Sequence, residues 1–191
     1  MIEKNILVSK NQIIIRSVPF DLEKEKWNEK NISDGIIWRK NYIVLDPLVD
    51  DSFGAWFIID KRNDIELDNN SIRAALLPFE IDNEEDFSIN TISESIYLFK
   101  NDKIDEPLEK TKGKYYPLNS KDNINFSRGK YSLLFEICLG FPPVENSQNE
   151  VYYKFSFIEN NNPEFKVLKD DDYGWKVNTC LDERQGRLIT K

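Results

Sequence analysis

The chain has 191 residues, of which 40% are hydrophobic and 13% aromatic, enough to bury the core of one large domain. This composition excludes long disorder, because disordered chains are poor in hydrophobic and aromatic residues. The formal net charge of −8 argues against direct binding to nucleic acid or to anionic membranes, and it favours attraction to a basic protein.

The chain carries little that is typical of a secreted or membrane protein. Its two cysteines, Cys138 and Cys180, are fewer than small secreted domains often have, and the sequence leaves open whether they form a disulfide. The N-terminal MIEKNILVSKNQIIIR has polar and acidic residues where a signal peptide needs an apolar core. No run reaches the ~18 apolar residues of a membrane span. We therefore expect a cytoplasmic protein with no membrane partner.

Alternation of apolar and polar residues with period two dominates the chain and predicts β-strands that place one face on a core. In chain order, the expected strands are 12–18, 36–45, 53–59, 72–81, 87–92, 95–99, 131–139, 151–158, 164–168 and 173–177. Residues 36–45 form either one long strand or a hairpin broken at 39–41. The one expected helix covers 21–31, with Asp21 as its N-cap.

Several local features refine this pattern. The run FGAWFII (53–59) is apolar on both faces and predicts a central strand, whereas Pro78 favours a sheet edge or a strand end. SRGK (127–130) predicts a turn. We predict an all-β fold, a two-sheet β-sandwich of about nine strands with one short helix. It is a single domain over 1–191, with a long loop near 101–123 and a C-terminal extension after 160.

Most catalytic motifs are absent from the sequence. The chain has no histidine, which removes Ser–His–Asp and Cys–His catalysis as well as histidine-based metal sites. It also has no glycine-rich phosphate loop. We predict that the protein is not an enzyme, and we assign no catalytic residues, no metal site and no cofactor.

Acidic residues are concentrated in two stretches around predicted strands. Residues 46–68 hold seven carboxylates and two bases, and residues 80–94 hold six carboxylates and no base. These acids are either a solvated surface with acidic turns or an electrostatic surface for a basic partner. Calcium is a third interpretation, because Asp50, Asp51 and the triple aspartate 170–172 lie in expected loops.

Two alternatives therefore stay open beside a protein-binding function. One is a calcium-dependent β-sandwich module. The other is a carbohydrate-binding domain that uses exposed aromatic side chains. Trp56 lies in an apolar strand and belongs to the core, but Trp38 alternates with Arg39 and could be exposed.

The order of these elements resembles a known family. A Trp-bearing acidic segment (Trp27, Glu29, Ile32, Gly35) precedes a buried aromatic strand. A segment ending in Pro78 and Phe79, a strand around 89–93 and the turn–strand SRGKYSL (127–133) follow. Together they resemble the competence protein J family, inhibitors of the DNA-entry nuclease, and similar immunity-type proteins, over roughly residues 12–158.

The resemblance implies a small acidic protein that binds a basic nuclease or nuclease toxin and blocks it. The acidic composition points to the same partner, because a nuclease needs a basic cleft for phosphates. We predict a cytoplasmic inhibitor or immunity protein that occludes the active site through an acidic surface. The predicted partner-binding residues are Asp46, Asp50, Asp51, Asp64, Glu66, Glu84, Glu85 and Asp86.

Overall fold

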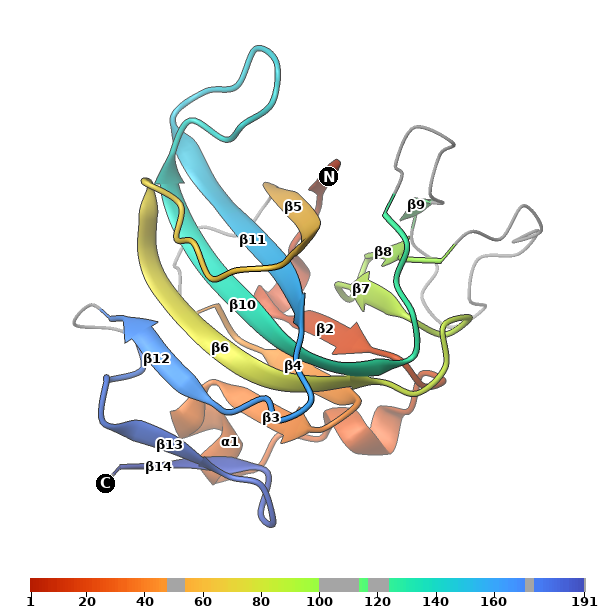
Figure 1. Ribbon diagram of the computed structural model, residues 1–191, viewed down its shortest axis with the longest axis vertical. Helices are drawn as coiled ribbons and strands as arrows, with labels where there is room; N and C mark the ends of the chain where they lie inside the picture. The colour runs from red at the N-terminus through yellow and green to blue at the C-terminus, as the bar shows by residue number, and fades with distance from the viewer. Residues whose placement is uncertain (48–53, 100–113, 117–123, 171–173, 191) are drawn as a thin grey trace.

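The computed structural model describes residues 1–47, 54–99, 114–116, 124–170 and 174–190. These residues form two six-stranded sheets, a separate two-stranded hairpin and short helices (Figure 1). The all-β, two-sheet prediction is therefore confirmed. The estimate of about nine strands was too low, because the described residues form fourteen strands, several of only three to five residues. None of the helices found among these residues has the length and apolar content needed to cross a bilayer.

The first sheet, sheet A, contains the longest strands. Its order is β1 (Ile2–Ile6), β5 (Ala55–Arg62), β11 (Glu150–Glu159), β10 (Gly129–Gly140), β6 (Ser71–Ile81) and β12 (Lys166–Lys169). Strands β5 and β11 are parallel, and the other neighbours are antiparallel. The apolar run that predicted a central strand is β5, which lies between β1 and β11 as expected.

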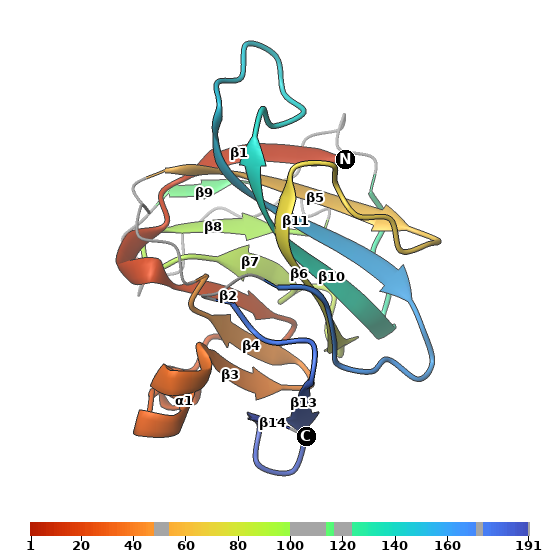
Figure 2. The same cartoon turned by 90° about the vertical axis from the view of Figure 1, so that its left-hand side faces the viewer.

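The second sheet, sheet B, is built from shorter strands. Its order is β3 (Ile36–Arg39), β4 (Tyr42–Leu45), β2 (Ile13–Arg16), β7 (Ser88–Asn90), β8 (Glu94–Tyr97) and β9 (Lys114–Tyr116). Residues 36–45 are thus a hairpin. Strand β9 lies inside the range in which the sequence predicted a long loop, and most of that range is outside the described residues. Figure 2 shows the strands of sheet B stacked one beside the next.

The main core fills the space between the two sheets. Alternate residues of the strands point into it, among them Ile15 of β2 and Phe155 of β11, both fully buried. Phe157 is central, because its ring contacts Phe87 and Phe126 edge-on at centroid distances of 5.2 Å each. Each buried phenylalanine contributes roughly 2–3 kcal/mol of transfer free energy, so these rings hold the sheets together.

The predicted helix over residues 21–31 is divided in two. A 3-10 turn, η2 (Leu22–Glu25), begins at Asp21, whose carboxylate accepts from Glu23 N at 3.0 Å and confirms the predicted cap. A second helix, α1 (Glu29–Asp34), begins at Asn28, whose side chain accepts from Lys30 N and Asn31 N. Asn28 has an extended backbone, so one continuous helix cannot pass through it. The remaining turn is η1 (Ser9–Asn11).

The C-terminal extension supplies a strand of sheet A and a hairpin. Strand β12 pairs with residues 74–76 of β6. Pro78 lies beyond this pairing, where β6 has a neighbouring strand only on its β10 side within the described residues, as the prediction of a sheet edge requires. The hairpin is β13 (Thr179–Asp182) with β14 (Arg187–Thr190). The predicted strand 173–177 is wrong for its described residues, 174–177. The Trp175 indole donates to Asp34 O at 2.7 Å, so this segment packs against the end of α1 instead of pairing in a sheet.

One connection of sheet A passes over its outer face. Strands β5 and β6 run in the same direction with β11 and β10 between them, so the chain must return across these two strands. The connection, residues 63–70, is called the crossover below. The crossover bends at residues 63–64 and ends in a turn at residues 69–70, where Ser71 N donates to Asp68 O at 3.0 Å.

Candidate partner-binding surface

The structure distributes the predicted binding residues over two ends of sheet A. Because β5 and β6 are parallel, both finish at one end, which we call the acidic end: residues 63–64 after β5 and residues 82–87 after β6. The opposite end carries the loop that joins β10 to β11, residues 141–149, and we call it the hairpin end. In both Figure 1 and Figure 2 this loop projects beyond the rest of the sheet.

The loop after β6 holds Glu84 and Glu85 exposed and Asp86 half-buried. Asn83 organises it, because its side chain accepts from Glu85 N at 3.1 Å and donates to Asp86 Oδ2 at 2.7 Å. The Glu84 carboxylate accepts from Arg128 N at 2.8 Å. The next residue, Phe87, is buried in the core, so the loop is fixed at that point while two carboxylates face solvent.

Asp64 and Glu66 lie on the crossover, and both are exposed. Between them Ile65 is 52% exposed. Arg62 supports this part of the chain, since its guanidinium pairs with Asp60 at 2.6 Å and donates to Glu66 O at 3.1 Å. Burial lowers the Arg62 pKa, but Asp60 outweighs it and leaves the pKa raised, so the guanidinium stays charged.

Asp46 lies near the hairpin end and is half-buried. Its backbone N–H donates to Gly35 O at 2.9 Å. Burial raises the pKa of the neighbouring Tyr153, and the charge of Asp46 raises it further. The predicted residues Asp50 and Asp51 lie outside the described residues. The predicted acids do not form one cluster in the described structure.

The acidic end is not uniformly negative. Lys40 pairs with Glu80 at 3.2 Å, and Lys61 pairs with Glu159 at 2.6 Å. Within the described residues, however, no basic side chain forms an ion pair with Asp64, Glu84 or Glu85. These three exposed carboxylates are available to an external cation.

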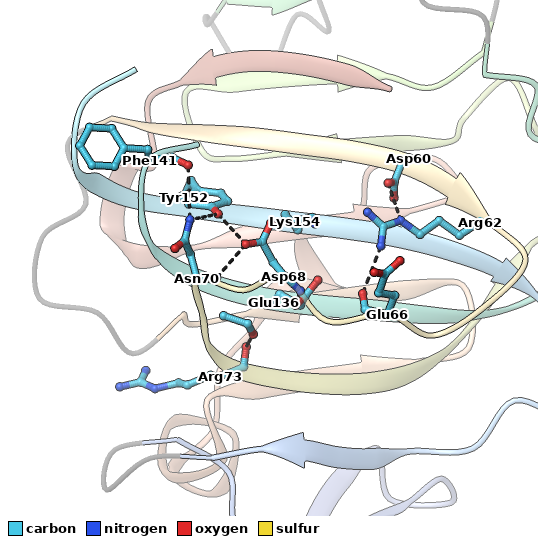
Figure 3. Close-up of polar contacts among 11 residues, drawn as sticks. Asp60, Arg62, Glu66, Asp68, Asn70, Arg73, Glu136, Phe141, Tyr152 and Lys154 are labelled. Carbon is cyan, nitrogen blue, oxygen red and sulfur yellow. Dashed lines mark hydrogen bonds and ion pairs between the residues drawn. The ribbon is translucent and has the colours of Figure 1, made fainter. Parts of the chain in front are cut away.

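A polar network under the crossover was missed by sequence reasoning (Figure 3). The Lys154 ammonium pairs with Asp68 Oδ2 at 2.9 Å, and the Tyr152 hydroxyl donates to Asp68 Oδ1 at 3.0 Å. Asp68 N donates to Glu136 Oε1 at 2.8 Å. Asn70 N donates to Asp68 Oδ1 at 2.8 Å, and Asn70 Nδ2 donates to the Tyr152 hydroxyl at 3.1 Å. We call these five residues the crossover network.

The pKa values of the two acids in this network shift in opposite directions. Glu136 is 0% exposed and one of its oxygens has no hydrogen-bond partner, and burial raises its pKa. Burial raises the pKa of Asp68 as well, but the hydrogen bonds from Asn70, Lys154 and Tyr152 outweigh it and leave the pKa lowered. Asp68 is thus the stable anion that faces Lys154.

The sequence pattern had placed Glu136 and Lys154 on the polar side of their strands. They do lie on the outer face and directly opposite each other in the β10–β11 pair, but the crossover buries them. No local signal marks this burial, because it depends on the path of residues 63–70 over two strands that come later in the chain. The only hint of this pairing in the sequence was that Glu136 and Lys154 carry opposite charges and lie in the middle of two consecutive predicted strands.

The other predicted alternatives gain no support from the described residues. No group of three His, Cys, Asp or Glu side chains in this part of the chain could hold a metal ion, and most of the triple aspartate lies outside it. Trp38 is buried and donates to Pro78 O at 2.9 Å, so the idea that it could be exposed is wrong. The other three tryptophans are half-buried. Cys138 and Cys180 are free thiols.

A small apolar pocket lies between Asp46, Arg73 and Trp175. Its volume of about 30 Å³ holds only one or two water molecules. Larger and more polar hollows of about 380, 590, 480 and 370 Å³ also lie on the described surface.

Comparison with known proteins identifies the family. Residues 5–158 match the family described as Competence protein J (ComJ). The chain belongs to the ComJ family. The resemblance inferred from the sequence is therefore confirmed, and the matched range includes both ends of sheet A but excludes the C-terminal extension.

A solved structure has the same fold. It is the crystal structure of ComJ from Bacillus subtilis, which is described as an inhibitor of the DNA-degrading activity of NucA. It matches 84% of this chain and 96% of that chain, with a TM-score of 0.51 and 14% sequence identity. No curated protein matches the chain.

Proposed function

We propose that this protein is a cytoplasmic inhibitor of a DNA-degrading nuclease and acts by binding the enzyme and covering its active site. Membership of the ComJ family carries this proposal. The family is one of nuclease inhibitors, so the prediction that the chain is not an enzyme is confirmed. The partner is a basic protein, and the chain itself makes no contact with nucleic acid or membrane.

The charge of the chain supports this kind of partner. A net charge of −8 attracts a protein whose cleft binds phosphates, and it repels the DNA that the nuclease would otherwise bind. The predicted residues Asp46, Asp64, Glu66, Glu84, Glu85 and Asp86 add to this field. The exposed carboxylates among them speed association even where they lie at the rim of the contact, because steering acts over about a Debye length, ~8 Å at physiological salt.

The test is a titration of purified protein against Bacillus subtilis NucA, the nuclease named for the solved relative, with DNA degradation as the readout. We expect stoichiometric inhibition that weakens as salt rises, since exposed charges contribute to association. Serum albumin, which is also acidic, is the control for non-specific charge effects. Undiminished DNA degradation at a large excess of the protein would overturn the proposal.

A further inference from the structure

The loop at the hairpin end combines exposed apolar side chains with a rigid base. Phe141 is 64% exposed and Leu139, two residues earlier near the end of β10, is 51% exposed, although residues 131–138 of that strand are all buried. Figure 3 shows the Phe141 ring projecting away from the crossover network. An exposed aromatic side chain of this kind on a protruding element is typical of a protein-binding hot spot.

The loop is held in place despite its projection. Pro142 is buried, and Val144 packs against the cluster of Ile58, Cys138 and Tyr152 on the outer face of sheet A. Val144 N also donates to Pro142 O at 2.7 Å. A loop that is fixed in this way loses little conformational freedom on binding, which favours affinity.

Asn70 joins the base of this loop to the crossover. Its backbone carbonyl accepts from Leu139 N at 3.0 Å, and its side-chain amide donates to Phe141 O at 3.4 Å and to the Tyr152 hydroxyl at 3.1 Å. The approach is close, because a Cβ on Gly140 would lie 2.6 Å from Asn70 Cγ. Asn70 thus fixes the three residues 139–141 on both sides of Gly140.

The crossover network holds Asn70 in turn. Asp68 accepts from Asn70 N and is paired with Lys154, whose side chain is only 6% exposed. Apolar residues of similar size would bury the same face without the desolvation of an ammonium and two carboxylates. Unlike apolar contacts, the hydrogen bonds of these charged groups are directional. They therefore define one position for the crossover and for the loop that Asn70 holds.

The charge of the loop selects the partner. Residues 139–150 contain Glu145 and Glu150 and no lysine or arginine. A projecting element with an apolar side chain and only negative charge fits a concave, basic surface. We propose that the loop 141–149 is the element that enters the basic cleft of the inhibited nuclease, with Phe141 as the central contact and Asn70 as its positioning residue. This inference rests on the proposed function and specifies which end of sheet A makes the contact.

The first experiment compares Phe141→Ala with Ile32→Ala. Ile32 is also 64% exposed but lies on α1, so its substitution removes a similar exposed apolar side chain elsewhere. Binding to immobilised NucA and inhibition of DNA degradation are measured for wild type and both variants. We expect Phe141→Ala to weaken binding at least tenfold, mainly through faster dissociation, and Ile32→Ala to change it less than twofold.

The outcomes separate the two proposals. If wild type does not inhibit NucA, the proposed function is overturned and this inference with it. If wild type inhibits and the two variants bind equally well, only the loop inference is overturned. A photoreactive phenylalanine at position 141 provides a measurement that does not depend on lost affinity: it must cross-link to NucA, and the same group at position 32 must not.

The role of Asn70 has its own test. We expect Asn70→Ala to weaken binding about fivefold in the wild-type background and to have no further effect in the Phe141→Ala background, since it acts through the placement of that ring. A purely structural role would lower the melting temperature and leave the binding of both backgrounds unchanged. That result, or equal losses in both backgrounds, would overturn the positioning role.

Discussion

The two ends of sheet A hold their exposed side chains by different means. At the acidic end, Asn83 holds Glu85 and Asp86, the Arg128 N–H donates to the Glu84 carboxylate, and the nearby ion pair of Lys61 and Glu159 is exposed. At the hairpin end, the loop with Phe141 depends on Asn70, which in turn depends on charges buried under the crossover. We therefore expect substitutions at the acidic end to have local effects. At the hairpin end, substitutions in the crossover network, far away in the sequence, should alter the position of Phe141.

This difference suggests a division of roles. The ends are separated by β10, which has twelve residues and is roughly 40 Å long at ~3.3 Å per residue. Exposed carboxylates at the acidic end act through the long-range field and affect the association rate. A desolvated aromatic side chain affects the dissociation rate. Four sets of substitutions can sharpen or break this comparison.

The largest difference is expected between two lysines. Lys154→Met leaves Asp68 and Glu136 buried without their cation and should lower the free energy of unfolding by about 3 kcal/mol or more. Lys61→Met removes an exposed ion pair at the acidic end and should cost less than about 0.5 kcal/mol. Urea denaturation of both variants measures the difference. Equal losses would show that the crossover network contributes no special stability.

The next difference is expected between two glycines with nearly the same backbone conformation. Gly140 and Gly129 have φ values of +155° and +158°, but a Cβ at Gly140 would lie 2.6 Å from Asn70 whereas one at Gly129 would be 3.9 Å from Tyr131. Gly140→Ala should therefore cost about 1–3 kcal/mol more than Gly129→Ala, because Asn70 has to move. Thermal unfolding measures this, and combining Gly140→Ala with Asn70→Ala should recover part of the loss. If the double variant is no more stable than Gly140→Ala alone, the contact with Asn70 is not the cause of the loss.

The two acids of the crossover network predict opposite pH dependences. The pKa of Asp68 is lowered below its usual 3.8, so its contribution to stability is present above that pH and is lost as the pH falls through the lowered value. The pKa of Glu136 is raised above 4.5, so its ionisation reduces stability as the pH rises from that value. Melting temperatures of Asp68→Asn and Glu136→Gln between pH 3 and 7 are compared with wild type.

We expect Asp68→Asn to be less stable than wild type near pH 7 and to approach it towards pH 3. Glu136→Gln should match wild type near pH 4 and gain relative to it as the pH rises. Parallel curves for both variants would mean that neither acid titrates differently in the folded and unfolded chain.

The smallest effect is expected at the acidic end. Replacing both Glu84 and Glu85 by lysine should slow association with NucA about threefold at physiological salt and leave the dissociation rate unchanged. The effect should disappear at high salt. A dissociation rate that rises as much as it does for Phe141→Ala would instead place the acidic end inside the contact.

The sequence by itself determined the fold class and the main strands. Alternation in the segments that became β10 and β11, the apolar run of β5, the capping by Asp21 and the position of Pro78 all act over short distances, so they can be read from neighbouring residues. The short strands β1 and β9 and the division of the helix at Asn28 were not predicted, because brief segments carry little periodic signal.

The tertiary structure alone decided where the charged and apolar residues of the candidate site lie. It placed Asp46 at one end of sheet A and Glu84 at the other, although both belong to acidic stretches of the sequence. It also buried Lys154 beneath a crossover that carries Asp68, 86 residues earlier in the chain. The physical reason is that local side-chain pattern fixes which face of a strand is polar, whereas only the path of distant connections determines whether that face meets water.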